Sequence, residues 1–230
     1  MYASGSILPA AASSMHYQNI LFDLDGTLTD PREGITRSIQ YALAQLGIDE
    51  PDLRRLEHFI GPPLLQCFMS TYGFDEARAW EAVNHYRVRF KDTGLYENRV
   101  FDGVGELLAL LGGQGRTLFI ATSKPTVFAA EIARHFDFAR HFKVIYGSEL
   151  DGSRTNKVEL IEHLLRLEGL DPAQTLMIGD RKHDLIGAHR NGLSAAGVGY
   201  GFGSREELLA ESPAHYFANL GELHAAFAAG

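Results

Sequence analysis

Five short apolar runs along the chain predict β-strands. In several of them apolar residues occupy consecutive positions, which is typical of strands buried on both faces of a parallel sheet. Between these runs, apolar residues recur every three or four positions, as in residues 157–167, and this predicts amphipathic helices. Strands alternating with helices indicate a doubly wound α/β domain. The predicted strands are Ile20–Leu24, Thr117–Ala121, Lys143–Tyr146, Thr175–Ile178 and Ser194–Val198.

The stretch from residue 31 to residue 97 has a different pattern, because it contains no convincing strand. An apolar stripe that starts at Ile35 ends at Gly47, a typical C-terminal stop for a helix. Asp75 is a plausible N-cap for a later helix. We therefore predict an all-helical cap, residues 31–97, inserted into an α/β core. That core consists of residues 17–30 and 98–230.

Composition and charge narrow the classes of protein. The chain has 230 residues, of which 45% are hydrophobic, and its net charge of −8 argues against binding a nucleic acid polymer. No apolar run is long enough to span a membrane. Residues 1–16 contain no Lys or Arg, so they match a secretory signal poorly and are interpreted as a loose N-terminal extension. The single cysteine, Cys67, excludes an internal disulfide, and together these features predict a cytoplasmic protein.

Two carboxylates stand near the end of the first predicted strand. Asp23 and Asp25 are two residues apart, so their side chains point to the same face of the strand. Carboxylates placed together repel unless a cation lies between them or one takes up a proton. The chain can turn closely around a ligand at Gly26. The pair therefore indicates a cation site, although Asp25-Gly26 alone would be explained equally well by an ordinary turn.

Three further polar clusters follow predicted strands or begin helices. Thr122 and Ser123 follow the second strand, Lys157 begins a helix, and Asp180 ends the fourth strand with Asp184 one helical turn later. Each cluster alone has a common structural explanation, such as a turn or a helix cap. Ligands of doubly wound sheets bind beyond the carboxyl ends of the strands. We therefore expect all four clusters to meet at one edge of the sheet.

Taken in order, these clusters resemble the four motifs of the haloacid dehalogenase superfamily of hydrolases. The matching residues are Asp23-Leu-Asp25-Gly-Thr27, Thr122, Lys157 and Gly179-Asp180-Arg-Lys-His-Asp184, and the similarity extends over about residues 17–228. The helical insert resembles the small cap of the branch that contains phosphoglycolate phosphatases. The segments around Thr122 and Lys157 look most similar to phosphoglycolate phosphatase-like proteins, some of which act as 5′-nucleotidases.

The resemblance implies a reaction and a role for each motif residue. Asp23 would attack phosphorus and form an aspartyl-phosphate, and Asp25 would act as acid and then base. Mg²⁺ would be bound by Asp23, the backbone carbonyl of Asp25 and Asp180. Asp184 would orient a water molecule or Lys157, and Thr27 would brace the turn after Asp25. The expected phosphate ligands are Thr122, Ser123 and Lys157.

The implied function is a magnesium-dependent phosphatase for a small phosphate monoester, phosphoglycolate phosphatase-like, with no obligatory protein partner. A 5′-nucleotidase is the main alternative. A sugar phosphomutase keeps the same motifs and differs in its products. A non-catalytic regulator is also compatible with the fold, although every reacting group is present here.

The cap offers candidates for substrate recognition. Gly61 and Pro62 interrupt a predicted helix and are expected to face the phosphate site. Arg37, or another cap cation such as Arg87, is expected to contact a second anionic group of the substrate. The cap aromatics are interpreted as a small hydrophobic core. They are Phe59, Phe68, Tyr72, Trp80, Tyr86 and Phe90.

Overall fold

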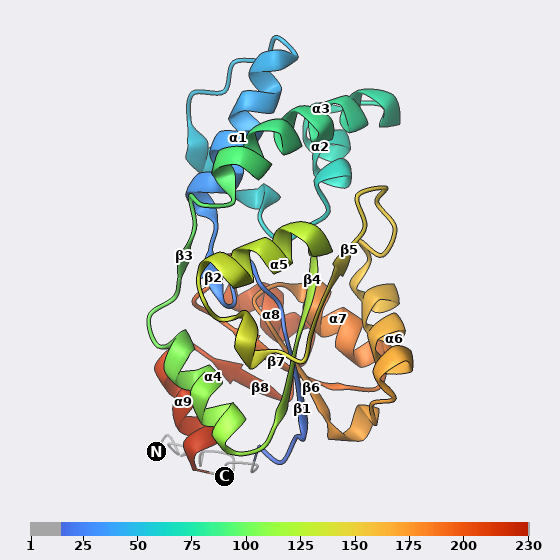
Figure 1. Cartoon of the computed structure of the whole chain (residues 1–230). Coiled ribbons are helices and arrows are strands. Elements are labelled where there is room, and N and C mark those ends of the chain that lie inside the picture. The colour runs from blue at the N-terminus through green and yellow to red at the C-terminus, as the bar shows by residue number, and fades with distance from the viewer. Residues whose placement is uncertain (1–14, 230) are drawn as a thin grey trace, which may run out of the picture.

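The computed structural model describes residues 15–229, and these form a three-layer α/β core beneath a helical cap (Figure 1). All pairings in the six-stranded sheet are parallel, in the order β5-β4-β1-β6-β7-β8. The predicted fold class is confirmed. The strands are β1 (Asn19–Phe22), β4 (Thr117–Pro125), β5 (Val144–Ser148), β6 (Thr175–Gly179), β7 (Ser194–Val198) and β8 (His215–Phe217).

Consecutive apolar residues in the central strand supply both faces of the sheet. Ile20 and Phe22 belong to one buried cluster, whereas Leu21 belongs to the other. The face with Ile20 is covered by α4 (Val104–Gly113), α5 (Thr126–His135) and α9 (Leu220–Ala228). The face with Leu21 is covered by α6 (Lys157–Glu168), α7 (Lys182–Arg190) and α8 (Arg205–Ala210). Short 3₁₀ turns, η3 (Ala139–His141) and η4 (Pro172–Gln174), precede β5 and β6.

Strand ends differ from the predicted ones where tertiary pairing extends or shortens them. β4 continues to Pro125 because its pairing with β5 resumes at Ser148 after a register shift that follows Ala121. The edge strand β8 was not predicted, since a three-residue run next to a polar loop gives little pattern to detect.

The cap consists of short helices stacked above the carboxyl ends of the strands (Figure 1). Asp75 caps α3 as predicted, since its side chain accepts a hydrogen bond from the backbone N–H of Arg78 at 2.8 Å. Cys67 is buried here. The elements are α1 (Arg32–Gln45), η1 (Leu53–Phe59), α2 (Leu64–Tyr72), α3 (Glu76–Arg89) and the π-helical turn η2 (Phe90–Gly94).

The chain enters and leaves the cap through two adjacent segments. β2 (Thr29–Asp30) and β3 (Arg99–Val100) pair antiparallel, which the sequence did not predict, and an Arg99–Asp30 ion pair of 3.0 Å joins them. The cap limits of 31 and 97 stay a prediction. An extension was predicted for residues 1–16, and residues 1–14 of it lie outside the part of the chain that the structure describes. Met15, however, is buried in the core, because its apolar side chain packs with the first hydrophobic cluster.

No helix within residues 15–229 combines the length and the apolar character that crossing a bilayer requires.

Candidate active site

The turn after β1 brings Asp23 and Asp25 into a buried position. Asp23 continues the ladder, because its backbone N–H donates to the Ile178 carbonyl at 2.9 Å. Both carboxylates are nearly inaccessible, at 4% and 6% exposure. Gly26 has a φ of 88°, and its backbone N–H bonds to the Thr29 carbonyl at 2.7 Å, which closes the turn. The predicted turn and the buried pair of acids are therefore both present.

Lys157 lies between two of the predicted acids. Its Nζ is 2.8 Å from Asp23 Oδ1 and 2.6 Å from Asp184 Oδ1, and only 5% of the residue is exposed. Burial alone would lower the pKa of Lys157, but the Asp184 and Asp23 carboxylates outweigh burial and raise that pKa. Asn156 places the lysine at the start of α6, because its side chain accepts from the Val158 N–H at 2.8 Å. Lys157 is thus a fixed positive charge beside Asp23.

Asp180 and Asp184 complete a cluster of acids with Asp23. One carboxylate oxygen from each of the three lies within 4.8 Å of the others. Burial, followed by repulsion from Asp23 and Asp184, raises the pKa of Asp180 well above its ordinary value. Burial likewise raises the pKa of Asp184 to about 6, although Lys157 opposes this. Three buried acids around one lysine therefore leave an excess of negative charge.

This cluster fits a magnesium ion. Every candidate ligand is an oxygen, which Mg²⁺ prefers, and a divalent cation would neutralise the repulsion that raises the pKa values. Asp184 Oδ1 is also fully buried, and apart from its 2.6 Å contact with Lys157 Nζ it has no polar partner among the described residues. Asp180 is oriented by the Phe202 N–H at 2.8 Å and by the predicted supporting residue Thr27, whose Oγ1 donates at 3.4 Å.

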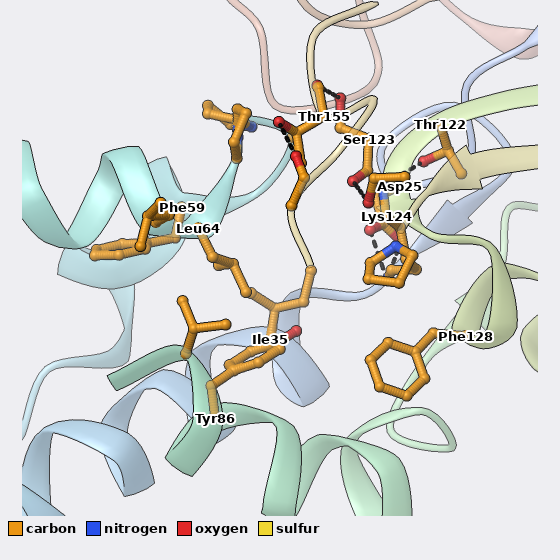
Figure 2. A pocket seen from close by; sticks show the side chains of 18 of the residues that line it. Asp25, Ile35, Phe59, Leu64, Tyr86, Thr122, Ser123, Lys124, Phe128 and Thr155 are labelled. Carbon is orange, nitrogen blue, oxygen red and sulfur yellow. Dashed lines mark hydrogen bonds and ion pairs between the residues drawn. The ribbon is translucent and has the colours of Figure 1, made fainter. Parts of the chain in front are cut away.

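The irregular end of β4 places the predicted phosphate ligands beside the acids. Thr122 is buried, and Thr122 and Ser123 line the same pocket as Asp23 and Asp25 (Figure 2). The Ser123 hydroxyl already donates to the Thr155 carbonyl at 3.2 Å. Its side chain therefore ties β4 to the loop before α6.

Sequence reasoning assigned no role to Lys124, which the structure places in the site. Its Nζ is 2.6 Å from Asp25 Oδ2 and donates to Asp25 Oδ1 at 2.8 Å (Figure 2). Burial raises the pKa of Asp25, and Lys124 acts in the opposite direction. The available signal was its position directly after Thr122 and Ser123 at a strand end, but a lysine in a turn is usually solvated.

The pocket between cap and core has one polar end and one aromatic end. Asp25, Thr122 and Lys124 form the polar end, whereas cap side chains face Phe128 across the aromatic end (Figure 2). The cap residues that line it are Ile35, Phe59, Gly61, Pro62, Pro63, Leu64, Leu65, Trp80, Val83, Tyr86, Arg87 and Phe90.

One cap prediction needs correction. Arg37 lies outside this pocket, exposed and paired with Glu33 at 2.9 Å, because it is two positions from the inward-facing Ile35 and so points away from the core. The cap aromatics form a hydrophobic core as predicted, since all six belong to the first buried cluster or pack against it. Four of the six also line the pocket, whereas Phe68 is fully buried and does not. Gly61 and Pro62 line the pocket. Arg87, the other cation considered, also lines it.

Comparisons with known proteins agree with this geometry. A family model described as haloacid dehalogenase-like hydrolase matches residues 20–198. A Pseudomonas aeruginosa protein named 5′-nucleotidase is 74% identical over 211 residues, covering 92% of this chain and 96% of that protein. A phosphoglycolate phosphatase of Neisseria gonorrhoeae is 28% identical over 84% of each chain. The crystal structure of a predicted phosphatase from Clostridium acetobutylicum superposes with a TM-score of 0.90 at 44% identity, covering 93% of this chain and 99% of that one.

Proposed function

Because the chain belongs to the haloacid dehalogenase-like hydrolases and is a phosphatase of that family, we propose that it hydrolyses nucleoside 5′-monophosphates. We further propose that the reaction needs magnesium and passes through an aspartyl-phosphate on Asp23. The sequence ranked phosphoglycolate first and a nucleotide second. The name of the 74% identical relative and the chemistry of the pocket favour the reverse order.

The aromatic end of the pocket is the observation that carries the choice of substrate. Trp80 and Arg87 both line the pocket from α3, and the Arg87 guanidinium lies over the Trp80 ring at 5.6 Å. Glycolate has no group that would use such a surface. A nucleobase offers a planar face for stacking and polar edge atoms for an arginine.

Arg87 is available to bind such an edge. Among the described residues it forms no ion pair, and half-burial lowers the pKa of its guanidinium. Lys124, the other cation lining the pocket, is occupied by Asp25. We therefore assign the phosphate to the end near Asp23 and the base to the end near Trp80 and Arg87.

In the proposed first step an Asp23 oxygen attacks phosphorus while the bond from phosphorus to the 5′-oxygen breaks. Asp25 gives its proton to that departing oxygen, so the nucleoside leaves as a neutral alcohol. Burial raises the pKa of Asp25, which suits a group that must begin as an acid. Water then attacks the phosphorus of the aspartyl-phosphate, Asp25 takes its proton, and inorganic phosphate and Asp23 are released.

The other residues hold charge in place during both steps. Lys157 stays beside Asp23 and faces the charge that develops on phosphoryl oxygen, and Thr122 supplies a hydroxyl at the same place. Asp23, Asp180 and the Asp25 carbonyl would hold Mg²⁺, with Asp184 supporting Lys157. The bound ion would supply the positive charge that lets an anionic nucleophile meet an anionic phosphate.

Steady-state kinetics with Mg²⁺ test the proposal. The panel contains nucleoside 5′-monophosphates, the matching 3′-monophosphates, phosphoglycolate and glucose 1-phosphate. We expect kcat/KM for the best 5′-monophosphate to exceed that for phosphoglycolate by at least about tenfold, since stacking and one charged hydrogen bond distinguish them. Equal or better turnover of phosphoglycolate would overturn the nucleotide assignment. Isomerised glucose phosphate without free phosphate would instead identify a mutase.

A further inference from the structure

We infer that Arg181 is a positioning residue for the phosphatase reaction, because it holds the cap loop 59–63 over the phosphate site. Arg181 directly follows Asp180 in the core, yet its Nη1 donates to the backbone carbonyl of Ile60 in the cap at 2.6 Å. Ile60 is fully buried. A charged donor bound to a buried carbonyl is a strong contact, and it joins the two halves of the site.

The cap loop has a shape that fits this arginine. Gly61 has a φ of +102°, and a Cβ added there would lie 3.0 Å from Arg181 Cγ and 3.3 Å from Nη1. The loop backbone therefore passes directly against the guanidinium, where a side chain at position 61 would be both strained and crowded. Phe59, Gly61, Pro62 and Pro63 all line the pocket, so a movement of this loop changes the wall that faces the substrate.

The core side of the contact is fixed by Glu207 on α8. Glu207 Oε1 accepts from Arg181 Nε at 3.0 Å and from the Lys182 N–H at 2.9 Å. The Arg181 and Glu207 side chains are only 14% and 21% exposed. Arg181 is consequently anchored through Nε, and its Nη1 is left to donate to the cap.

This arrangement favours the closed position of the cap. If the cap lifts, the Ile60 carbonyl moves away from a donor that is already held in place, and a strong hydrogen bond is exchanged for water. Closure excludes water from the first step and completes the pocket. Arg181 acts through the loop, without contacting the reacting atoms. The inference rests on the proposed placement of the active site at Asp23 and holds for any leaving group.

Trp80, the chain's only tryptophan, can report cap closure. It lines the pocket from the cap, and a Cβ added to Gly152 of the core loop before α6 would lie 3.2 Å from its ring. Opening the cap separates these surfaces and exposes the indole. Acrylamide quenching of tryptophan fluorescence therefore measures the cap position without an activity assay.

The experiment compares wild type with Arg181→Met, Arg181→Lys and Gly61→Ala, each with Mg²⁺ and orthovanadate. We expect Arg181→Met to raise the Trp80 quenching constant about twofold and to lower kcat/KM for 5′-monophosphates and p-nitrophenyl phosphate by about tenfold, the effect of one charged hydrogen bond. Arg181→Lys should recover part of both. Gly61→Ala disturbs the same contact from the cap side and should reproduce both effects.

Arg205→Met is the matched control, because Arg205 is exposed on α8, over the Tyr216 ring at 5.5 Å and away from the cap. It should leave quenching and kinetics unchanged. Lost activity with wild-type quenching in both Arg181→Met and Gly61→Ala would overturn the inference, as would wild-type values throughout. Asp23→Asn separates the two proposals, since it should abolish turnover while Trp80 quenching stays at the wild-type level.

Discussion

Lys124 and Asp25 form a buried ion pair in which Nζ lies 2.6 Å from Oδ2. The Phe90 ring of the cap lies 4.8 Å from the same Nζ, so the cap closes directly over the pair. Asp25 is the proposed acid and base. The charge that opposes the effect of burial on the pKa of Asp25 therefore comes from the same strand end that is proposed to bind the phosphate.

Replacing Lys124 should shift the pH dependence of the reaction. Lys124 lowers the pKa of Asp25 against the larger effect of burial, so Lys124→Met should let Asp25 keep its proton to higher pH. The alkaline limb of the profile of kcat against pH should move to higher pH, because Asp25 stays protonated longer. At pH 7, kcat should fall by about 10²-fold, since the second step needs Asp25 in its ionised form. Lys143→Met, which removes a surface pair with Glu168, is the control. An unmoved alkaline limb would contradict the role given to Lys124.

Replacing Asp23 should remove activity without removing the fold. Asp23→Asn deletes the nucleophile, and we expect phosphate release to fall by at least about 10³-fold. It also reduces the repulsion among Asp23, Asp180 and Asp184, so Tm without metal should stay equal or rise. Phosphate release and thermal unfolding measure the two effects. Substantial residual turnover by Asp23→Asn would exclude an aspartyl-phosphate at this position.

Magnesium should stabilise the protein as well as activate it. A ligand at 100 times its Kd stabilises the folded state by about 2.7 kcal/mol, which corresponds to roughly 5–10 °C in Tm for a chain of this size. EDTA should abolish activity and reverse the shift. Asp180→Asn should lose most of the Mg²⁺-dependent shift, because Asp180 contributes one of the clustered carboxylates. An Mg²⁺ response of Asp180→Asn equal to that of wild type would place the metal elsewhere.

Arg87 should matter to the leaving group more than to the fold. Among the described residues it has no ion-pair partner, and it lines the pocket beside the Trp80 ring. Arg87→Gln should raise KM for 5′-monophosphates about tenfold, with little change in kcat or Tm. Arg78, which lies over the Phe74 ring, offers a control on the same helix. Should KM for phosphoglycolate rise as much as KM for nucleotides, Arg87 binds an anion and not a base.

His215 should make stability fall in mild acid. Burial lowers its pKa in the folded state, so the unfolded chain binds the proton more readily. The stability linked to this group is present above its unfolded pKa, near 6.5, and is lost as the pH falls through the lower folded value. The free energy of unfolding in urea should decrease from pH 7.5 to pH 5.5, and less steeply in His215→Gln. A steeper decrease in that variant would show that His215 is favoured in its charged form.

Much of the fold was determined by local pattern. The consecutive apolar residues Ile20–Phe22 predict a strand that is covered on both faces. In the structure Ile20 belongs to the buried cluster on one face of the sheet and Leu21 to the cluster on the other. The position of acids and hydroxyls at strand ends sufficed to predict that Asp23, Thr122, Lys157 and Asp180 meet, because all carboxyl ends of a parallel sheet lie at one edge. Those four residues do lie together.

The rest was decided by contacts between segments distant in sequence. Local periodicity places Arg37 off the apolar stripe of α1, but it does not show that Arg87 lines the pocket, because the way α3 faces the core depends on packing. The Lys124–Asp25 pair joins residues 99 positions apart, and the Arg181–Ile60 bond joins residues 121 apart. The first pair depends on how β1 and β4 lie side by side in the core sheet, and the second on how the cap is seated on the core. Both arrangements are set by the summed burial of side chains between distant segments, which no short window of sequence contains.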